Sequence, residues 1–310
     1  NFELQLQSVP IDCDGKVLYL VAETEQELER GEEIARNHLQ HKRVVLALPR
    51  EPLPLTEAAV EVWSLLQMQQ DGELVGSDPL ILPELQQMTD DARGHLQRLI
   101  NRLLWPAKDG PRWFHCGEEL AADTARDLRQ SLSHIMNEVY HLTPILNNEM
   151  IVRKKPSPTL INSRKKLNLG ILERAGTPNL GLEGNTPDVS MFRTLLVQTG
   201  LYRRDGERCG FAAPHAIEDP GLRTVWEKIR DFLTLPSESH KRPADLIKEL
   251  QSPPIGLRAG VIPILISAGL KAFPSAISLM KEGEYITDIL PSVIEDLCRK
   301  PEAYRLIVLD

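Results

Sequence analysis

The sequence predicts an α+β fold that is mainly helical, and three observations lead to this prediction. Two short, continuously apolar runs near the amino terminus flank a helical segment, which is typical of a parallel α/β unit. Helical periodicity then dominates the middle of the chain. From residue 221 onward, helix, turn, helix and hairpin follow one another in the order of a winged helix.

A chain of 310 residues is too long for one core of the usual size, and its 42% hydrophobic residues supply enough apolar material for folded domains. The sequence suggests three parts. Residues 1–110 form a small α/β lobe with a long helix, residues 111–220 a helical, basic middle, and residues 221–310 a winged-helix-like domain.

The lobe begins with a predicted strand at 17–22, a helix from Glu25 to about Gln40, and a second strand at Val44–Leu48. Thr24 and Glu27 have capping-box spacing, which marks the start of the helix. Two parallel strands are not stable alone, so the sequence predicts further strands from elsewhere, for example from residues before Asn1.

The spacing of apolar residues, together with the positions of prolines and glycines, predicts the remaining helices and strands. Helices are predicted over 56–70, 78–105 and from Asp123 or Thr124 to about Tyr140, with a hairpin at 112–120. The middle carries predicted helices at 143–152, 158–174 and 187–199, and a loop at 176–187. The last part carries predicted helices at 221–233, 243–251, 258–273 and 291–299, with a hairpin at 277–289 that turns near Gly283.

Charge is divided unevenly along the chain. Residues 1–150 contain 25 Asp/Glu and 13 Lys/Arg, a net charge of −12, whereas residues 151–310 contain 19 and 23, a net charge of +4. No acidic residue occurs between Glu149 and Glu173. A field of one sign attracts partners of the opposite sign, so this pattern favours a polyanion or an acidic protein surface as the partner of the second part.

The candidate nucleic-acid contacts are basic residues of this second part: Arg153, Lys154, Lys155, Arg164, Lys165, Lys166, Arg203 and Arg204. Cations on flexible stems suit contacts with the phosphates of DNA or RNA. Two other interpretations remain open, because such residues also form solvated faces and can pair with the acidic first part of the same chain. On a helix, Arg164, Lys165 and Lys166 cannot all face one way.

The winged-helix order by itself does not predict a DNA reader. A helix that enters the major groove is polar and basic, whereas the helix at 258–273 offers only Arg258 and Lys271, near its ends. Its apolar centre predicts burial, so a structural or protein-contact role is favoured for this part.

The sequence contains no motif that indicates catalysis or a cofactor. The four cysteines are Cys13, Cys116, Cys209 and Cys298, and none forms the CxxC pair of a usual zinc site. The patterns GxxxxGK[ST], GxSxG and HExxH are absent, so no catalytic or metal-binding residue and no cofactor is predicted. The most apolar run, at 260–270, is shorter than a membrane span, so we expect a cytoplasmic protein without a membrane partner.

Four segments resemble stretches of large bacterial P-loop ATPases from phage-defence gene clusters of the BREX and related kinds. They are RWFHCGEEL (112–120), NEVYHLTPILNNEMIVRK (137–154), NLGLEGNTPDVSMFRTLLVQTGLYR (179–203) and PPIGLRAGVIPILISAGLKAF (253–273). The resemblance implies an accessory region of such an ATPase, with ATP hydrolysis located elsewhere in the parent protein. Because the phosphate-binding motifs are missing here, no catalytic residue of that family is assigned.

The sequence therefore favours a non-catalytic regulatory or nucleic-acid-engaging region of a large, multidomain bacterial ATPase. The alternative is a protein-interaction scaffold, in which the apolar helix at 258–273 and the acidic lobe dock other domains or subunits. An enzyme with an unrecognised site is a third possibility. Residue 1 is Asn and not Met, so we expect the chain to start within a longer protein.

Overall fold

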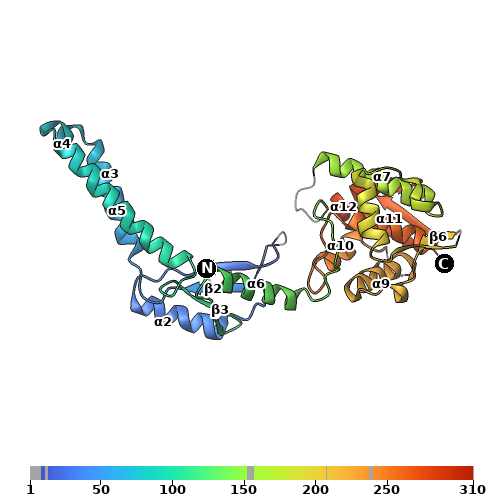
Figure 1. Ribbon diagram of the computed structural model, residues 1–310, viewed down its shortest axis with the longest axis horizontal. Coiled ribbons are helices and arrows are strands. Elements are labelled where there is room, and N and C mark those ends of the chain that lie inside the picture. The colour runs from blue at the N-terminus through green and yellow to red at the C-terminus, as the bar shows by residue number, and fades with distance from the viewer. Residues whose placement is uncertain (1–7, 11–12, 152–156, 207, 237–239, 310) are drawn as a thin grey trace. The chain divides into compact units, whose positions relative to one another are not determined.

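Contacts within the chain separate it into two units, Asn1–Val139 and Tyr140–Asp310. The structure is a computed structural model of residues 1–310 and describes all of them except 1–7, 11–12, 152–156, 207, 237–239 and 310 (Figure 1). The predicted class, α+β and mainly helical, is confirmed. The division into three parts, with boundaries after residues 110 and 220, stays a prediction.

The first unit contains a four-stranded sheet with the order β1-β2-β3-β4. Strands β1 (Lys16–Tyr19) and β2 (Val44–Leu48) are parallel and are joined through helix α2 (Glu25–Glu33) and the π-helical turn η1 (Ile34–His38), as the sequence predicts. The capping box at Thr24 is present. The other strands, β3 (Arg112–His115) and β4 (Glu118–Leu120), form an antiparallel hairpin on β2. The further strands that the sequence predicts for this sheet are therefore β3 and β4, which follow residue 110.

Strand β2 is buried on both faces because helices cover each side of the sheet. Its even-numbered residues Val44, Leu46 and Leu48 pack with the residues of α2 and η1. Its odd-numbered residues Val45 and Ala47 pack against helix α6 (Ala125–Val139), whose start is capped by the Thr124 hydroxyl. The continuous apolar run in the sequence thus reflects a strand between two helical layers.

Helices α3 (Leu55–Gln70) and α5 (Ile81–Leu104) lie side by side, with the short helix α4 (Gly72–Ser77) at the turn between them (Figure 1). We call α3, α4 and α5 the helical arm. The inward residues of α5 follow the 4-3-4-3 spacing of an antiparallel coiled coil. These residues are Leu85, Thr89, Ala92, Leu96, Leu99 and Leu103.

The arm differs from its prediction in two details. The long helix begins at Ile81 and not at Asp78, because Asp78 has an extended backbone that ends the separate short helix at Gly72–Ser77, which Asp71 caps. Met88 lies at helical spacing from Leu85 and Ala92, which predicts an apolar contact, but it is exposed, and Thr89 lies in the seam instead. Thr89 is accommodated there because its hydroxyl donates to the carbonyl of Leu85 and accepts a hydrogen bond from the Gln69 amide.

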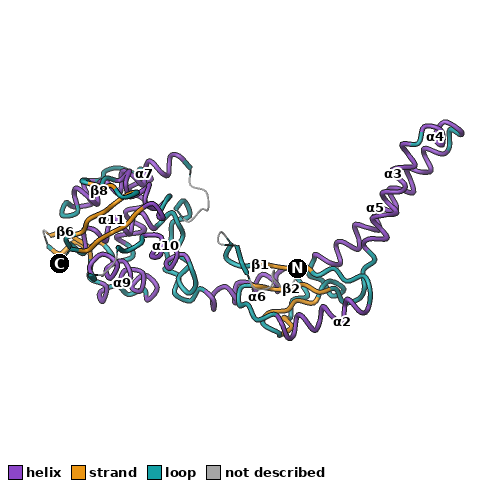
Figure 2. The backbone as a smooth tube through the Cα atoms, turned by 180° about the vertical axis from the view of Figure 1, so that it is seen from behind, coloured by secondary structure: helices purple, strands orange, loops and turns teal. Residues whose placement is uncertain are grey.

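The second unit combines helices with two small antiparallel sheets, and Figure 2 shows strands and helices in both units. The main helices are α7 (Pro158–Arg174), α8 (Pro187–Phe192), α9 (Pro220–Thr234), α10 (Pro243–Gln251), α11 (Ile262–Ala272) and α12 (Pro291–Arg299). Short turns of helix are η2 (Pro178–Gly181), η3 (Arg193–Val197), η4 (Pro214–Ala216) and η5 (Pro301–Ala303). The strands are β5 (Tyr202–Asp205), β6 (Arg208–Phe211), β7 (Ile277–Lys281), β8 (Glu284–Ile286) and β9 (Tyr304–Val308).

Most of these helices match the predicted ranges, but one prediction is wrong. The described part of the segment at 143–152 is not helical. Pro144 disfavours helix in the residue before it, and Asn148 instead makes a local turn by accepting hydrogen bonds from the Ile151 amide. Strand β9 was not predicted. It pairs with β7 and gives the sheet order β8-β7-β9.

Helix α11 forms the centre of the second unit. All of its residues from Ile262 to Gly269 are buried, as the apolar run predicts, and helices α7, α9 and α12 pack around it. Aromatic rings extend this core toward the β5–β6 hairpin in a chain of neighbouring pairs. The rings are Phe192, Tyr202, Phe211, Trp226 and Phe273.

Candidate nucleic-acid interface

Helix α7 presents its basic residues in two directions. It starts at Pro158, and the Ser157 side chain caps it by accepting from the Leu160 amide. Its inner face packs into the core through residues such as Leu160, Leu167 and Ile171. Arg164 shares this inner face, whereas Lys165 and Lys166 are exposed.

Arg164 forms a buried ion pair, so its assignment to the nucleic-acid surface is corrected. Its Nε and Nη2 lie 2.7 and 2.5 Å from the two carboxylate oxygens of Glu295 on α12. Its Nη1 donates to the carbonyl oxygen of Gly260 at 3.0 Å. The side chains of Arg164 and Glu295 are only 8% and 12% exposed, so this guanidinium is unavailable to a phosphate.

The position of Arg164 follows from helical periodicity. Leu160, Arg164, Leu167 and Ile171 recur at the three- and four-residue spacing of one helix face, which could have indicated burial. Asn168 continues this face and is also buried, and its side-chain amide has no hydrogen-bond partner among the described residues. The inner face of α7 therefore carries buried polar side chains among its apolar core contacts.

The β5–β6 hairpin presents three exposed arginines. Arg203 and Arg204 lie on β5, and Arg208, which the sequence analysis did not assign, lies on β6 opposite Asp205. Arg203 donates to the carbonyls of Gly200 and Ala216, and Arg204 to that of Gly206. Because a guanidinium has five N–H donors, both retain donors for an outside ligand.

The hairpin is held by its base to the carboxyl end of α7. The Tyr202 hydroxyl donates to the carbonyls of Ala175 and Thr177, at 3.0 and 2.7 Å. Lys165 lies nine residues before Arg174, the end of α7, which corresponds to roughly 14 Å along a helix. The structure thus gives two separate basic groups, Lys165 with Lys166 and Arg203 with Arg204 and Arg208.

None of these five exposed cations forms an ion pair with a carboxylate of the described residues. The remaining predicted contacts, Arg153, Lys154 and Lys155, lie outside the described residues. By unit, Asn1–Val139 carries 24 Asp/Glu and 13 Lys/Arg, a net charge of −11, and Tyr140–Asp310 carries 20 and 23, a net charge of +3. The second unit therefore keeps the positive balance that the sequence shows.

Arg203 also borders a cavity of about 330 Å³. Its lining residues include Thr194 and Thr199, but also the acidic residues Glu218 and Asp219. Asp219 caps helix α9 by accepting from the Leu222 amide at 2.6 Å. Two carboxylates disfavour a phosphate inside this cavity, so the exposed side of the hairpin is the better place for an anion.

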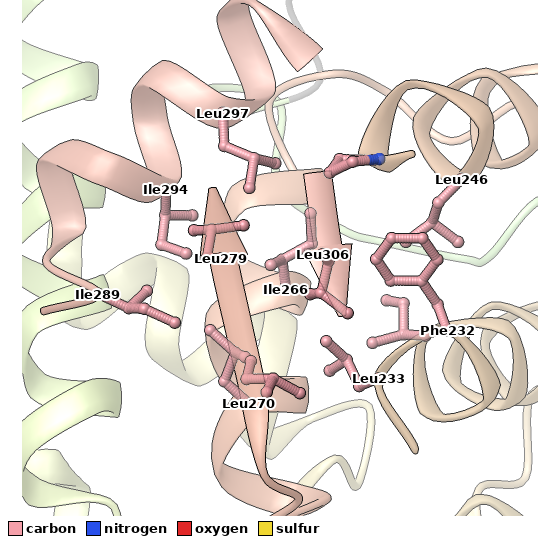
Figure 3. A pocket seen from close by; sticks show the side chains of 13 residues that line it. Phe232, Leu233, Leu246, Ile266, Leu270, Leu279, Ile289, Ile294, Leu297 and Leu306 are labelled. Atoms are coloured by element: carbon pink, nitrogen blue, oxygen red, sulfur yellow. The ribbon is translucent and has the colours of Figure 1, made fainter. Parts of the chain in front are cut away.

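A second cavity lies in the core between α9, α10, α11, α12 and the β7–β9 sheet (Figure 3). Figure 3 shows that the side chains around it are aliphatic or aromatic, among them Phe232, Ile266 and Leu306. Its volume is about 20 Å³, far below the roughly 300–1,000 Å³ of pockets that hold small-molecule ligands. This cavity is a packing gap in an apolar core.

Metal-ligating side chains do not gather in the described part of the chain. No three His, Cys, Asp or Glu side chains there come close enough together to hold a metal ion. Burial raises the pKa of the Cys298 thiol to about 12, so this cysteine is a poor nucleophile. Burial also raises the pKa of Cys116.

Comparison of the chain with models of protein families, with curated proteins and with solved structures found no match. Over the described residues, every helix is too short or too polar to cross a bilayer.

Proposed function

We propose that the second unit engages the sugar-phosphate backbone of nucleic acid through its exposed cations. Lys165, Lys166, Arg203 and Arg204 are the predicted contacts, and Arg208 joins them. The observation that carries the proposal is their exposure without a carboxylate partner among the described residues, in a unit of net charge +3. Such contacts position a nucleic acid without reading its bases.

We also propose that the last part of the chain has a winged-helix-like arrangement. Helices α9, α10 and α11 followed by the β7–β8 hairpin have the corresponding order. Since α11 is buried, it offers no residues for base contacts in a major groove. We therefore expect weak sequence preference and a strong dependence of affinity on salt.

The wider setting is proposed from the resemblance to phage-defence ATPases. In this setting the chain is a non-catalytic accessory region of a large bacterial ATPase in the cytoplasm, and nucleotide hydrolysis takes place elsewhere in the parent protein. The lack of GxxxxGK[ST] in the sequence supports this division of labour. Nucleic-acid contact here would place the ATPase on its target.

Fluorescence anisotropy with labelled duplex and single-stranded DNA, at two salt concentrations, tests the backbone contact. We expect Arg203→Gln, Arg204→Gln and Arg208→Gln together to weaken binding and to reduce the slope of log K against log salt. Each lost phosphate contact changes that slope by about 0.9 for duplex DNA. Lys165→Glu with Lys166→Glu tests the second basic group in the same way.

The matched control removes exposed cations from the acidic unit, with Arg98→Gln and Lys108→Gln. This control should leave DNA affinity unchanged. Two results would overturn the proposal. The first is that the hairpin and lysine variants bind DNA as strongly as the unmodified chain does, and the second is that the unmodified chain does not bind DNA at low salt.

A second candidate function is a protein-interaction scaffold, which exposed apolar side chains on the helical arm favour. The helix at 258–273 does not serve this role as expected, because its helical part, α11, is enclosed by the core. Light scattering after size-exclusion chromatography separates the two functions. A stable oligomer without DNA affinity favours the scaffold, whereas a monomer that binds DNA favours the first proposal.

A further inference from the structure

The helical arm carries charge of one sign only over most of its length. Residues 51–92 include nine Asp/Glu and no Lys, Arg or His. Exposed helices usually mix both signs, because Glu and Lys four residues apart stabilise a helix. Helix capping explains Asp71, but Glu57, Glu61, Glu73 and Glu84 are exposed and form no ion pair with a described residue.

Large apolar side chains stand exposed among these carboxylates. Trp63 and Val60 on α3 are 62% and 53% exposed. Met68, Leu80 and Met88, nearer the turn, are 44%, 67% and 54% exposed. Single exposed apolar residues are common on proteins, whereas a tryptophan exposed beside another apolar residue on one helix face is typical of an interaction site.

Val60 and Trp63 point away from the seam of the arm. The seam positions of α3 are Ala58, Val62, Leu65 and Gln69, which pack or bond against α5. With this heptad spacing, Val60 and Trp63 fall on the opposite face of α3, one turn apart. Glu57 lies one turn before Val60 on the same exposed face, and Glu61, one turn after Glu57, lies at the edge of that face on the side away from Trp63. We call Glu57, Val60 and Trp63, with Glu61 at their edge, the α3 outer face.

We infer that the α3 outer face docks a protein partner whose surface has an apolar socket bordered on one side by Lys and Arg. Trp63 would fill the socket, with Val60 beside it, and Glu57 and Glu61, on the far side of Val60, would meet the basic border. The all-negative charge of residues 51–92 identifies the occupant, because a face of one sign attracts a surface of the opposite sign. Two copies of this arm would repel each other along the acidic stretch, so a second copy is disfavoured.

The test uses the full chain and a defined probe, an 18-residue peptide of lysine and leucine arranged as an amphipathic helix. Its affinity is measured by calorimetry and by the emission shift of tryptophan. We expect Trp63→Gln with Val60→Gln to weaken binding by about 10-fold or more. Glu57→Gln with Glu61→Gln should weaken it less and reduce its salt dependence.

The matched control is Trp105→Gln, because Trp105 is also 62% exposed but lies outside the acidic stretch, at the carboxyl end of α5. It should bind the peptide as the unmodified chain does, and circular dichroism should show unchanged helix content in all variants. A scrambled peptide of equal composition should bind more weakly.

Three outcomes overturn the inference. The first is no difference between the α3 outer-face variants and the unmodified chain. The second is an equal loss of binding in the Trp105→Gln control. The third is a concentration-dependent dimer in sedimentation velocity that disappears on Trp63→Gln, which would assign this face to a second copy. DNA binding by the second unit is measured separately and does not decide any of these outcomes.

Discussion

Arg164 and Glu295 lie 131 positions apart in the sequence, yet they form a bidentate ion pair inside the second unit. A buried charge without its partner is costly, because the interior offers no water to replace it. Arg164 also donates a hydrogen bond to the carbonyl of Gly260. Helices α7 and α12 and the segment before α11 therefore meet at the Arg164 side chain. This contact orders three segments that are distant in the sequence.

We predict that Arg164→Ala lowers the free energy of unfolding by about 3–5 kcal/mol, since it leaves Glu295 buried and unpaired. Urea denaturation followed by circular dichroism measures the change. Replacing both partners, with Arg164→Met and Glu295→Met, should cost less than the single change. Lys165→Ala, one position along but exposed, should change stability little, and an equal loss in this control would contradict the role given to Arg164.

Glu32 makes the corresponding contact in the first unit. Its carboxylate oxygens accept hydrogen bonds from Arg112 on β3 at 3.2 and 2.8 Å, which ties α2 to the sheet. The Arg112 guanidinium lowers the pKa of Glu32 from 4.5 to about 2, and Arg36 adds to this effect against the opposing desolvation. The carboxylate therefore stays charged in the folded unit at pH values where it is protonated in the unfolded chain.

This shift predicts how stability depends on pH. A carboxyl group with a lowered pKa in the folded state stabilises fully above its unfolded pKa, and this stabilisation is lost as pH falls from about 4.5 toward 2. We expect Glu32→Gln to be less stable than the unmodified chain at pH 7 and to lose less stability over that range. The measurement is the urea midpoint at several pH values. Glu33→Gln removes an exposed neighbour, and if it flattens the profile equally, Glu32 is not the group responsible.

At the scale of elements, close approach of backbones limits substitution at Gly260. A Cβ atom at this position would lie 2.1 Å from the carbonyl oxygen of Ile151, a backbone atom that cannot rotate away. We predict that Gly260→Ala destabilises the second unit by about 1–3 kcal/mol, as overpacking does elsewhere. Thermal unfolding measures it.

Gly210→Ala on strand β6 is the control for Gly260→Ala, because no heavy atom lies within 4 Å of the added Cβ. It should leave the midpoint of thermal unfolding nearly unchanged. Equal shifts at both positions would contradict the steric argument.

Local signals predicted most elements, and pairing between distant segments accounts for the rest. Prolines mark the first turns of α7, α9, α10 and α12, and each of these helices begins where the sequence indicates or within one residue of that point. The strand pair β1 and β2 was visible as apolar runs, but its continuation through β3 and β4 depends on contacts that no local pattern encodes. The same holds for β9, whose alternating burial arises from pairing with β7.

For the candidate site, sequence predicted the charges but not their surroundings. Lys165, Lys166, Arg203 and Arg204 are exposed as a phosphate contact requires, while Arg164, next to Lys165, is enclosed by Glu295. The difference depends on the direction of one helix face and on a carboxylate far along the chain. Neither can be read from a run of three basic residues.

At the scale of the whole molecule, the two units carry net charges of opposite sign, −11 and +3. The proposed partners differ accordingly. A nucleic acid suits the positive unit and a basic protein surface suits the negative one, so both interactions should weaken as salt rises. One chain could then bring a nucleic acid and a protein together.

The four tryptophans are distributed so that each unit holds one shielded indole, Trp113 in the first and Trp226 in the second, which are 1% and 0% exposed. Trp63 and Trp105 are open to solvent. If these two are exchanged for phenylalanine, the remaining emission comes from two protected fluorophores, and removing either one leaves a reporter for the other unit. The chain thereby has built-in optical probes for following whether its halves unfold together or in sequence.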